Sequence, residues 1–353
     1  MTFKFAGLCL LVAATLAPAV LDAADYVNRK GGEKRVAGTI TEATKTELTI
    51  KPSTGEPVTV PANDVASIEW NDAPSEMKLG RSDEANGRFA SALQRFAKAL
   101  EDGRPSNELV KTDLDFLIAR ATARAAFADP QSRDDAVAKL TSFMKANPDS
   151  FRWYDAQQLL GQVQLAREDF AAARTAFETL SQAPWNDVKL SASVNLGRVL
   201  MAENKLDEAA QAFDTAIAAA GSTPGEVSRK YEAMVGKARS LVAQNKQAEA
   251  LTVLNEVVDQ ASPEESALLA EAYVLQGACL QAADKPKEAV LAYLHVDVLF
   301  ARESAAHAEA LYHLAKLWKV VQHPDRAQEA QDKLEGDHPN SEWTKKLTAG
   351  GAE

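Results

Sequence analysis

Two different spacings of apolar residues divide the chain. Between residues 25 and 72, apolar and polar residues alternate in short runs such as RVAGTITEA and TELTIKP. Alternation with a period of two predicts β-strands, and the stretches rich in Gly and Pro between the runs predict turns. After Pro74 the apolar residues recur with helical spacing. We therefore expect a small β-module at residues 25–72 and a helical domain at residues 73–347.

The alternating segment supplies four or five short strands. So many short strands suit a small antiparallel β-barrel, because closure leaves no long edge strand unpaired. The order of the runs resembles that of SH3-like and Sm-like barrels. This resemblance rests on the spacing of Val36, Gly38 and Ile40, of Leu48 and Ile50, and of the run from Val58 to Pro61. It predicts a barrel-like module in front of the helices.

The helical domain is built from a repeat in which small and large residues recur together. The copies align on a recurring alanine, found at Ala92, Ala136, Ala173, Ala209, Ala250, Ala289 and Ala327. Four positions later comes a large residue: Phe96, Leu140, Phe177, Phe213, Leu254 and Tyr293, but Gln331 in the last copy. Twelve positions earlier comes a small one: Gly80, Gly161, Gly197, Ala238, Gly277 and Ala315, but Arg124 in the second copy. Antiparallel helices approach closely only at small residues, so we expect each small residue to face the alanine of its partner helix.

These residues resemble the pattern of tetratricopeptide repeats. The clearest copies are Leu79, Gly80, Gly87, Phe89, Ala92, Phe96 and Ala99; then Leu160, Gly161, Phe170, Ala173, Phe177 and Pro184; then Leu196, Gly197, Leu206, Ala209, Phe213 and Ala216. The resemblance implies a mainly α-helical solenoid of about seven helix pairs. The copies are longer than the usual repeat of about 34 residues, and the second carries extra residues between Ala128 and Asp134. The alternative is an Ala-rich helical bundle without solenoid order.

The resemblance also implies where a partner binds. In such solenoids the first helix of each pair lines a concave groove that holds a peptide or protein. The groove residues implied here are Gln158, Gln162, Asn195, Arg198, Glu232, Arg239, Tyr312, His313 and Lys316. Some members of the family grip a terminal carboxylate with Lys and Asn side chains, and only Asn195 matches that pattern.

Both ends of the chain carry expectations of their own. Lys4 is followed by an apolar run over residues 5–16 and then by small residues up to Ala24. This layout is typical of a secretory signal peptide, and the run is too short to span a bilayer. We therefore expect residues 1–24 to be a signal peptide that directs export to the periplasm or cell envelope, or secretion. Residues 348–353 are expected to be a disordered tail.

Charge and cysteine content limit the partners. The formal net charge is −11, so the chain repels nucleic-acid phosphates and anionic lipid surfaces. Protein partners are expected, stable membrane insertion is not, and homo-oligomerisation stays open. Cys279 is the one cysteine after residue 24, so no internal disulfide is expected in the exported chain.

No motif with catalytic chemistry stands out. The sequence contains no Gly-x-Gly-x-x-Gly after a strand and no Walker loop, and Ser142 with Lys145 lacks the partner motifs of acyl-transfer enzymes. His307 and His313 lie on different faces of the expected helix, which disfavours a metal site. We expect no catalytic, cofactor-binding or metal-binding residues. Two other hypotheses are an enzyme with unrecognised carboxylate chemistry and a nucleic-acid-binding Sm-like module.

Overall fold

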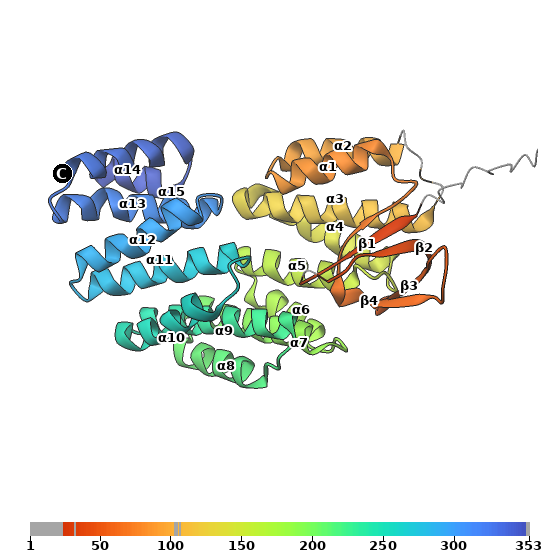
Figure 1. The fold of residues 1–353 in the computed structure, drawn as a ribbon, viewed down its shortest axis with the longest axis horizontal. Coiled ribbons are helices and arrows are strands. Elements are labelled where there is room, and N and C mark those ends of the chain that lie inside the picture. Colours follow the sequence, from red (N-terminus) through yellow and green to blue (C-terminus); the bar gives the residue numbers. More distant parts are fainter. Residues whose placement is uncertain (1–23, 32, 102–104, 106, 351–353) are drawn as a thin grey trace, which may run out of the picture.

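A computed structural model describes residues 24–31, 33–101, 105 and 107–350 (Figure 1). The signal peptide predicted at residues 1–24 lies outside this range except for Ala24, and so do residues 351–353. The described part consists of an N-terminal sheet followed by helices to its end.

The N-terminal sheet is antiparallel, as the alternating pattern predicts. Its strands are β1 (Asp25–Arg29), β2 (Val36–Ala43), β3 (Glu47–Lys51), β4 (Val58–Pro61) and β5 (Val65–Glu69), with a 3-10 helix η1 (Ala62–Asp64) before β5. The strand order is β4-β3-β2-β1-β5. Alternate side chains such as Leu48 and Ile50 are fully buried, so one face of the sheet forms a core.

The prediction of a closed barrel is wrong. β4 and β5 are the two edges of an open sheet and do not pair with each other. Ile68 and Trp70 instead share one continuous core with Met77, Leu114 and Leu117 of the first helices. A sheet edge can be protected by a covering element as well as by closure, and here helices take that role.

The remaining described elements are helices in seven antiparallel pairs followed by one further helix. The first helices are α1 (Ser75–Ala85), α3 (Glu108–Ala128), α5 (Trp153–Ala166), α7 (Asn186–Ala202), α9 (Pro224–Ala243), α11 (Ser266–Ala282) and α13 (Ser304–Val320). The second helices are α2 (Phe89–Glu101), α4 (Arg133–Ala146), α6 (Phe170–Leu180), α8 (Leu206–Ala219), α10 (Gln247–Gln260), α12 (Pro286–Leu299) and α14 (Pro324–Asp337). The last helix is α15 (Glu342–Gly350), which reaches into the predicted tail at residues 348–353.

Six of the seven pairs turn in the same way. One residue between the two helices has a left-handed backbone: Gly87, Glu168, Asn204, Asn245, Asp284 and Gln322, with φ between 56° and 72°. This conformation ends a helix tightly and satisfies its last carbonyl groups. The exception is the pair α3 and α4, joined through Asp129 and a 3-10 helix η2 (Pro130–Ser132). This is the place of the extra residues noted in the second copy.

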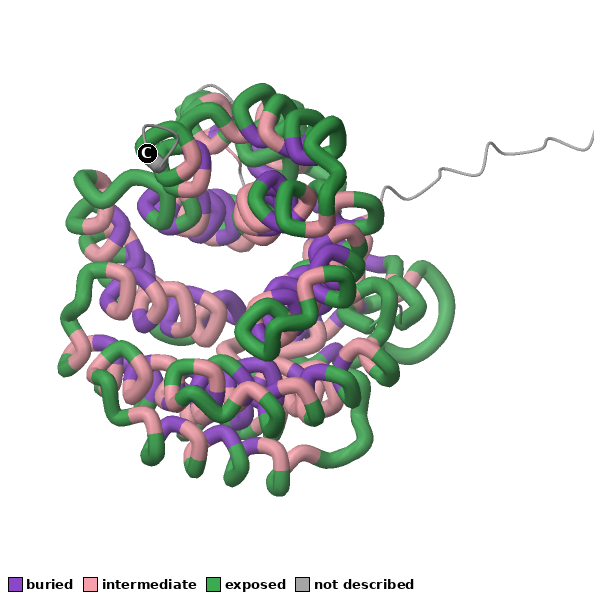
Figure 2. The backbone as a smooth tube through the Cα atoms, turned by 90° about the vertical axis from the view of Figure 1, so that its left-hand side faces the viewer, coloured by how far each residue is buried: buried purple, intermediate pink, exposed green. Residues whose placement is uncertain are grey.

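The pairs form two layers. First helices contact the first helix of the next pair from α3 to α13, whereas second helices mainly contact their own first helix and the next one. The first helices therefore form the inner layer of a curved array. Figures 1 and 2 show the pairs curving round until α13 to α15 lie on the same side of the molecule as α1 and α2. The prediction of a solenoid is confirmed, and a bundle without solenoid order is excluded.

The repeated residues are buried as expected, but the small residue has a different neighbour. All seven alanines of the repeat are at most 1% exposed. The glycines of the repeat lie closest to the aromatic ring sixteen positions later: a methyl group at Gly161 or Gly197 would come within 2.6 Å of the ring of Phe177 or Phe213, respectively. The ring of a Phe or Tyr is bulkier than most aliphatic side chains, so the helix it packs against needs a bare backbone at that point.

Gly197→Ala is expected to lower the free energy of unfolding by about 1–3 kcal/mol, the usual cost of overpacking a core. The ring of Phe213 lies between Gly197 and Gly236 and has no free space on either side. Urea denaturation followed by far-UV circular dichroism measures the change. The matched control is Gly336→Ala on α14, where a methyl group meets nothing within 4 Å. The control change is expected to raise the free energy of unfolding by about 0.5–1 kcal/mol, because Ala is a better helix former than Gly. Equal effects of the two changes would contradict the packing argument.

The sheet is joined to the helices by polar contacts as well as by the shared core. The indole of Trp70 donates a hydrogen bond of 2.9 Å to Asp113 on α3, and Asn63 donates one of 2.9 Å to Asp187 on α7. The ammonium group of Lys45 lies 3.3 Å from the centre of the Trp153 ring. The β-module is thus built onto the first four helix pairs.

Candidate protein-binding surfaces

The nine residues predicted to line a groove all lie on first helices: two each on α5, α7 and α9, and three on α13. Gln158 and Gln162 are partly exposed, and neither side chain makes a hydrogen bond to the described residues. Asn195 is only 2% exposed, and its amide is used within α7: it donates to the Ser191 carbonyl at 2.8 Å and accepts from Arg198 at 3.2 Å. The two glutamines are therefore more accessible than Asn195.

The three predicted residues on α13 lie together under the last helix. The His313 ring stacks on Tyr293, with ring centres 4.8 Å apart, and its Nδ1 lies 3.1 Å from the side-chain oxygen of Gln281. Trp343 of α15 packs 5.1 Å from the Tyr312 ring, while Lys316 stays exposed beside it. Burial and the charges of Lys316 and Lys346 lower the pKa of His313 to about 4. The histidine is therefore neutral near pH 7.

The middle of the inner layer carries a row of acids. Arg239 is exposed and pairs with Glu271 on the next first helix at 2.8 Å, and Glu232 pairs with Arg229 at 2.5 Å. Burial raises the pKa of Glu309 on α13. The row consists of the residues six positions before the small residue of the repeat: Asp155, Glu232, Glu271 and Glu309, with Ser191 interrupting it. Of these, only Glu232 was predicted as a groove residue, although the others occupy the same position of the repeat.

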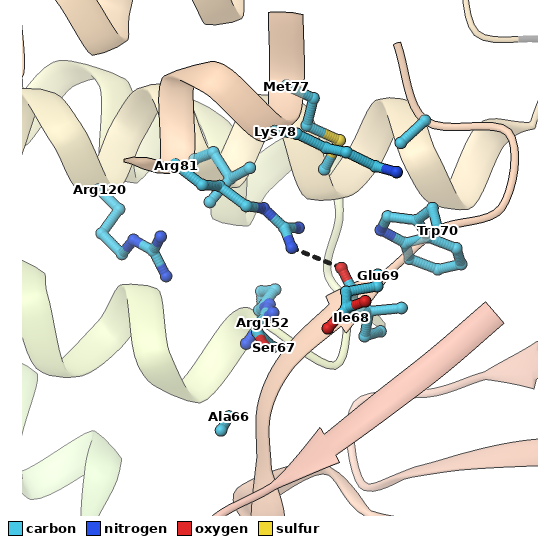
Figure 3. Close-up of a pocket in the computed structure, with 12 residues that line it drawn as sticks. Ala66, Ser67, Ile68, Glu69, Trp70, Met77, Lys78, Arg81, Arg120 and Arg152 are labelled. Atoms are coloured by element: carbon cyan, nitrogen blue, oxygen red, sulfur yellow. Dashed lines mark hydrogen bonds between the residues drawn. The ribbon is translucent and has the colours of Figure 1, made fainter. Parts of the chain in front are cut away.

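A second surface, absent from the sequence predictions, is a pocket between the sheet and the helices. We call it the junction pocket. It has a volume of about 470 Å³ and lies where β5 meets α1, α3 and the start of α5 (Figure 3). Its lining is Ala66, Ser67, Ile68, Glu69, Trp70, Ala73, Met77, Lys78, Arg81, Leu117, Arg120 and Arg152. It therefore combines four cationic side chains with apolar ones.

A buried carboxylate holds the pocket wall in place. Asp113 is completely buried, and it accepts hydrogen bonds from Arg81 at 2.6 Å, from Arg152 at 3.0 Å and from Trp70 at 2.9 Å. Burial alone would raise the pKa of Asp113, but the charges of Arg152 and Arg81 and these hydrogen bonds hold it below its usual value. Arg81 also donates to the Ile68 carbonyl at 2.5 Å (Figure 3). One ionised carboxylate thus fixes two arginines and ties β5 to α1 and α3.

Candidate chemistry elsewhere is sparse. Among the described residues, no group of three His, Cys, Asp or Glu side chains could hold a metal ion. Cys279 is buried, and burial raises the pKa of its thiol to about 11. Within the described ranges, no helix is both long and apolar enough to cross a bilayer.

Comparison with known proteins identifies the helical array. A family model for the tetratricopeptide repeat matches residues 159–225 and, overlapping them, residues 194–266. Residues 159–266 therefore match tetratricopeptide repeats, and the helical domain has the fold of a tetratricopeptide-type solenoid. A tetratricopeptide repeat protein from Parabacteroides merdae ATCC 43184 has a TM-score of 0.50 at 16% identity, over 77% of this chain and 95% of that one. A Rap protein complexed with Competence and Sporulation Factor has a TM-score of 0.52 at 15% identity, over 78% and 75% of the two chains. No curated protein sequence matches this chain.

The matched tetratricopeptide repeats run from within α5 to the first residue of α11. They contain the predicted groove residues Gln162, Asn195, Arg198, Glu232 and Arg239. All residues that line the junction pocket come before residue 159, so the pocket lies outside the matched residues. The repeat pattern alone could not reveal this pocket, because part of its wall comes from β5 and the segment that follows it, which lie outside the repeats.

Proposed function

We propose that this protein is an exported, non-enzymatic scaffold that holds another protein on the inner layer of its tetratricopeptide repeats. The observation that carries the proposal is the continuous layer of first helices from α3 to α13, on which all nine predicted groove residues lie. Repeat solenoids use such extended concave surfaces for binding, because successive helices offer side chains at regular intervals. Export is proposed from the layout of residues 1–24.

The partner is expected to match the charges on this layer. Arg239 and Lys316 are exposed cations on first helices, and the acidic row lies beside them. A partner that binds here therefore presents acids and bases in alternation, and its binding depends on the sign of these side chains.

The combined variant Arg239→Glu and Lys316→Glu is expected to weaken capture of the native partner at least about tenfold, because rim charges set the complementarity of an interface. The measurement is affinity purification of the tagged mature protein from its native envelope fraction, with quantitative mass spectrometry of the proteins that copurify. Both side chains are exposed, so helicity by far-UV circular dichroism is expected to stay as in the native chain.

The matched control is Lys287→Glu on α12, a second helix. Lys287 is exposed and makes no ion pair with the described residues, and it lies off the inner layer. It is expected to capture the same proteins as the native chain. If the double variant also captures them in unchanged amounts, the inner layer is not the binding surface.

A further inference from the structure

Three cationic groups in the junction pocket are free to bind a ligand. Arg120 uses Nε and one terminal nitrogen to bind Glu84, and Arg152 uses Nε and one terminal nitrogen for Asp113 and Asp155. The remaining terminal nitrogen of each guanidinium makes no hydrogen bond to the described residues. Lys78 likewise has no ion-pair partner in the described part of the chain, and it is exposed at the pocket mouth. These groups come from three different elements and line one cavity.

The charged side chains that line the pocket are mostly cationic. Glu69 is the single acid in its lining, and its carboxylate accepts a hydrogen bond of 3.0 Å from Asn28. Asp113 and Glu84 are buried behind the arginines. The lining thus carries four cations, Lys78, Arg81, Arg120 and Arg152, although the whole chain has a net charge of −11. A group with two oxygens and a negative charge is the natural ligand of guanidinium groups.

The other walls of the pocket limit which kinds of ligand can bind. The floor is apolar, since Trp70, Met77 and Leu117 are at most 2% exposed and lie against the cavity. The volume of about 470 Å³ falls in the range of small-ligand sites, about 300–1,000 Å³. The anion therefore carries an apolar group next to it, which a phosphate or a sulfate alone does not provide.

One wall is the free edge of a sheet. β5 is an edge strand, and Arg81 donates to the Ile68 carbonyl from the side away from β1. In an antiparallel strand the N–H and C=O of one residue point to the same side, so the N–H of Ile68 is also directed into the pocket. Edge strands bind extended peptides through such groups.

We propose that the junction pocket binds a carboxylate of an extended peptide segment, with the charge on Arg120 and Arg152 and a neighbouring apolar side chain on Trp70, Met77 and Leu117. The carboxylate comes from a peptide C-terminus or from an acidic side chain. None of the nine predicted groove residues lines this pocket, so the site can be tested without knowing the partner held on the inner layer.

The test uses three fluorescein-labelled hexapeptides of Ala and Leu with the full mature chain, followed by fluorescence anisotropy. The first ends in a free carboxylate, the second is amidated and carries one central Glu, and the third is amidated and carries Gln in place of Glu. We expect the first or the second to bind, which identifies the source of the carboxylate, and the third to bind at least about tenfold more weakly. Equal binding of all three, or no binding of either carboxylate peptide up to about 1 mM, would overturn the proposal.

Variants then locate the binding. Lys78→Glu is expected to weaken binding of the peptide about tenfold, because the new carboxylate repels that of the peptide. Ala66→Phe is expected to block the cavity with its ring. Lys78 and Ala66 are both exposed, so these changes leave the core intact, and Lys287→Glu serves as the charge control. Hydrogen exchange at the Ile68 amide is expected to slow when the peptide binds the native chain. Binding that is the same in Lys78→Glu, Ala66→Phe and the native protein would place the peptide elsewhere and refute the assignment.

Discussion

Replacing Asp113 with Asn is expected to lower the free energy of unfolding of the N-terminal half by about 3–5 kcal/mol. Asp113 is fully buried between Arg81 and Arg152 and also accepts the indole hydrogen bond of Trp70. Asn has the same shape but no charge, so the Arg152 guanidinium, 3% exposed, would stay buried without an anion on its Nε. Removing one member of a buried ion pair costs more than the pair contributes, because the other charge is left uncompensated.

Hydrogen exchange read by mass spectrometry can locate this loss. Peptides from β5, α1 and α3 are expected to exchange much faster in Asp113→Asn, whereas peptides from α11 to α14 stay as in the native protein. The control is Asp115→Asn, two residues along the same helix, where burial raises the pKa of the carboxyl group, so that its charge adds no stability to the fold. This control is expected to be close to neutral. Equal protection of β5 in the native chain and in Asp113→Asn would show that Asp113 does not hold the junction together.

The C-terminal repeats are expected to lose about 3 kcal/mol of stability on acidification, through His313 alone. Burial, followed by the charges of Lys316 and Lys346, lowers the pKa of His313 from 6.5 to about 4. The unfolded chain therefore takes up a proton at a higher pH than the folded chain does. The contribution of His313 is fully present above pH 6.5, declines as the pH falls towards 4, and is lost below that.

Urea denaturation of the native chain and of His313→Phe at pH 7.5 and pH 4.0 isolates this contribution. Phe keeps the stacking on Tyr293 but cannot be protonated, so the variant is expected to lose less stability between the two pH values. Glu309 acts in the opposite direction, since burial raises its pKa, and it is present in both proteins and cancels in the comparison. His295→Phe, an exposed site on α12, is the control and is expected to respond to acid as the native chain does. An identical pH response of native and His313→Phe would contradict the assignment.

The repeat was predictable from the sequence because its cause is local and recurs. A bare backbone under each ring of Phe177, Phe213 or Tyr293 requires a small residue at a fixed distance along the chain. The helical boundaries follow from the same register, and so does the single irregular pair at α3 and α4. The pattern did not settle which residue the glycine contacts. We expected the alanine of the second helix, and the structure places the aromatic ring nearest to the glycine. The alanine and the ring lie on the same buried face of the second helix, so the spacing alone could not distinguish them.

The sequence by itself therefore determined the solenoid and the antiparallel strands. The tertiary structure alone decided that the sheet stays open and that Arg81 and Arg152 meet Asp113 at its edge. The physical reason is distance along the chain. Contacts within a repeat are fixed by helical geometry, whereas Trp70, Asp113 and Arg152 meet only because the sheet packs against α1, α3 and α5, and no spacing in the sequence encodes that packing.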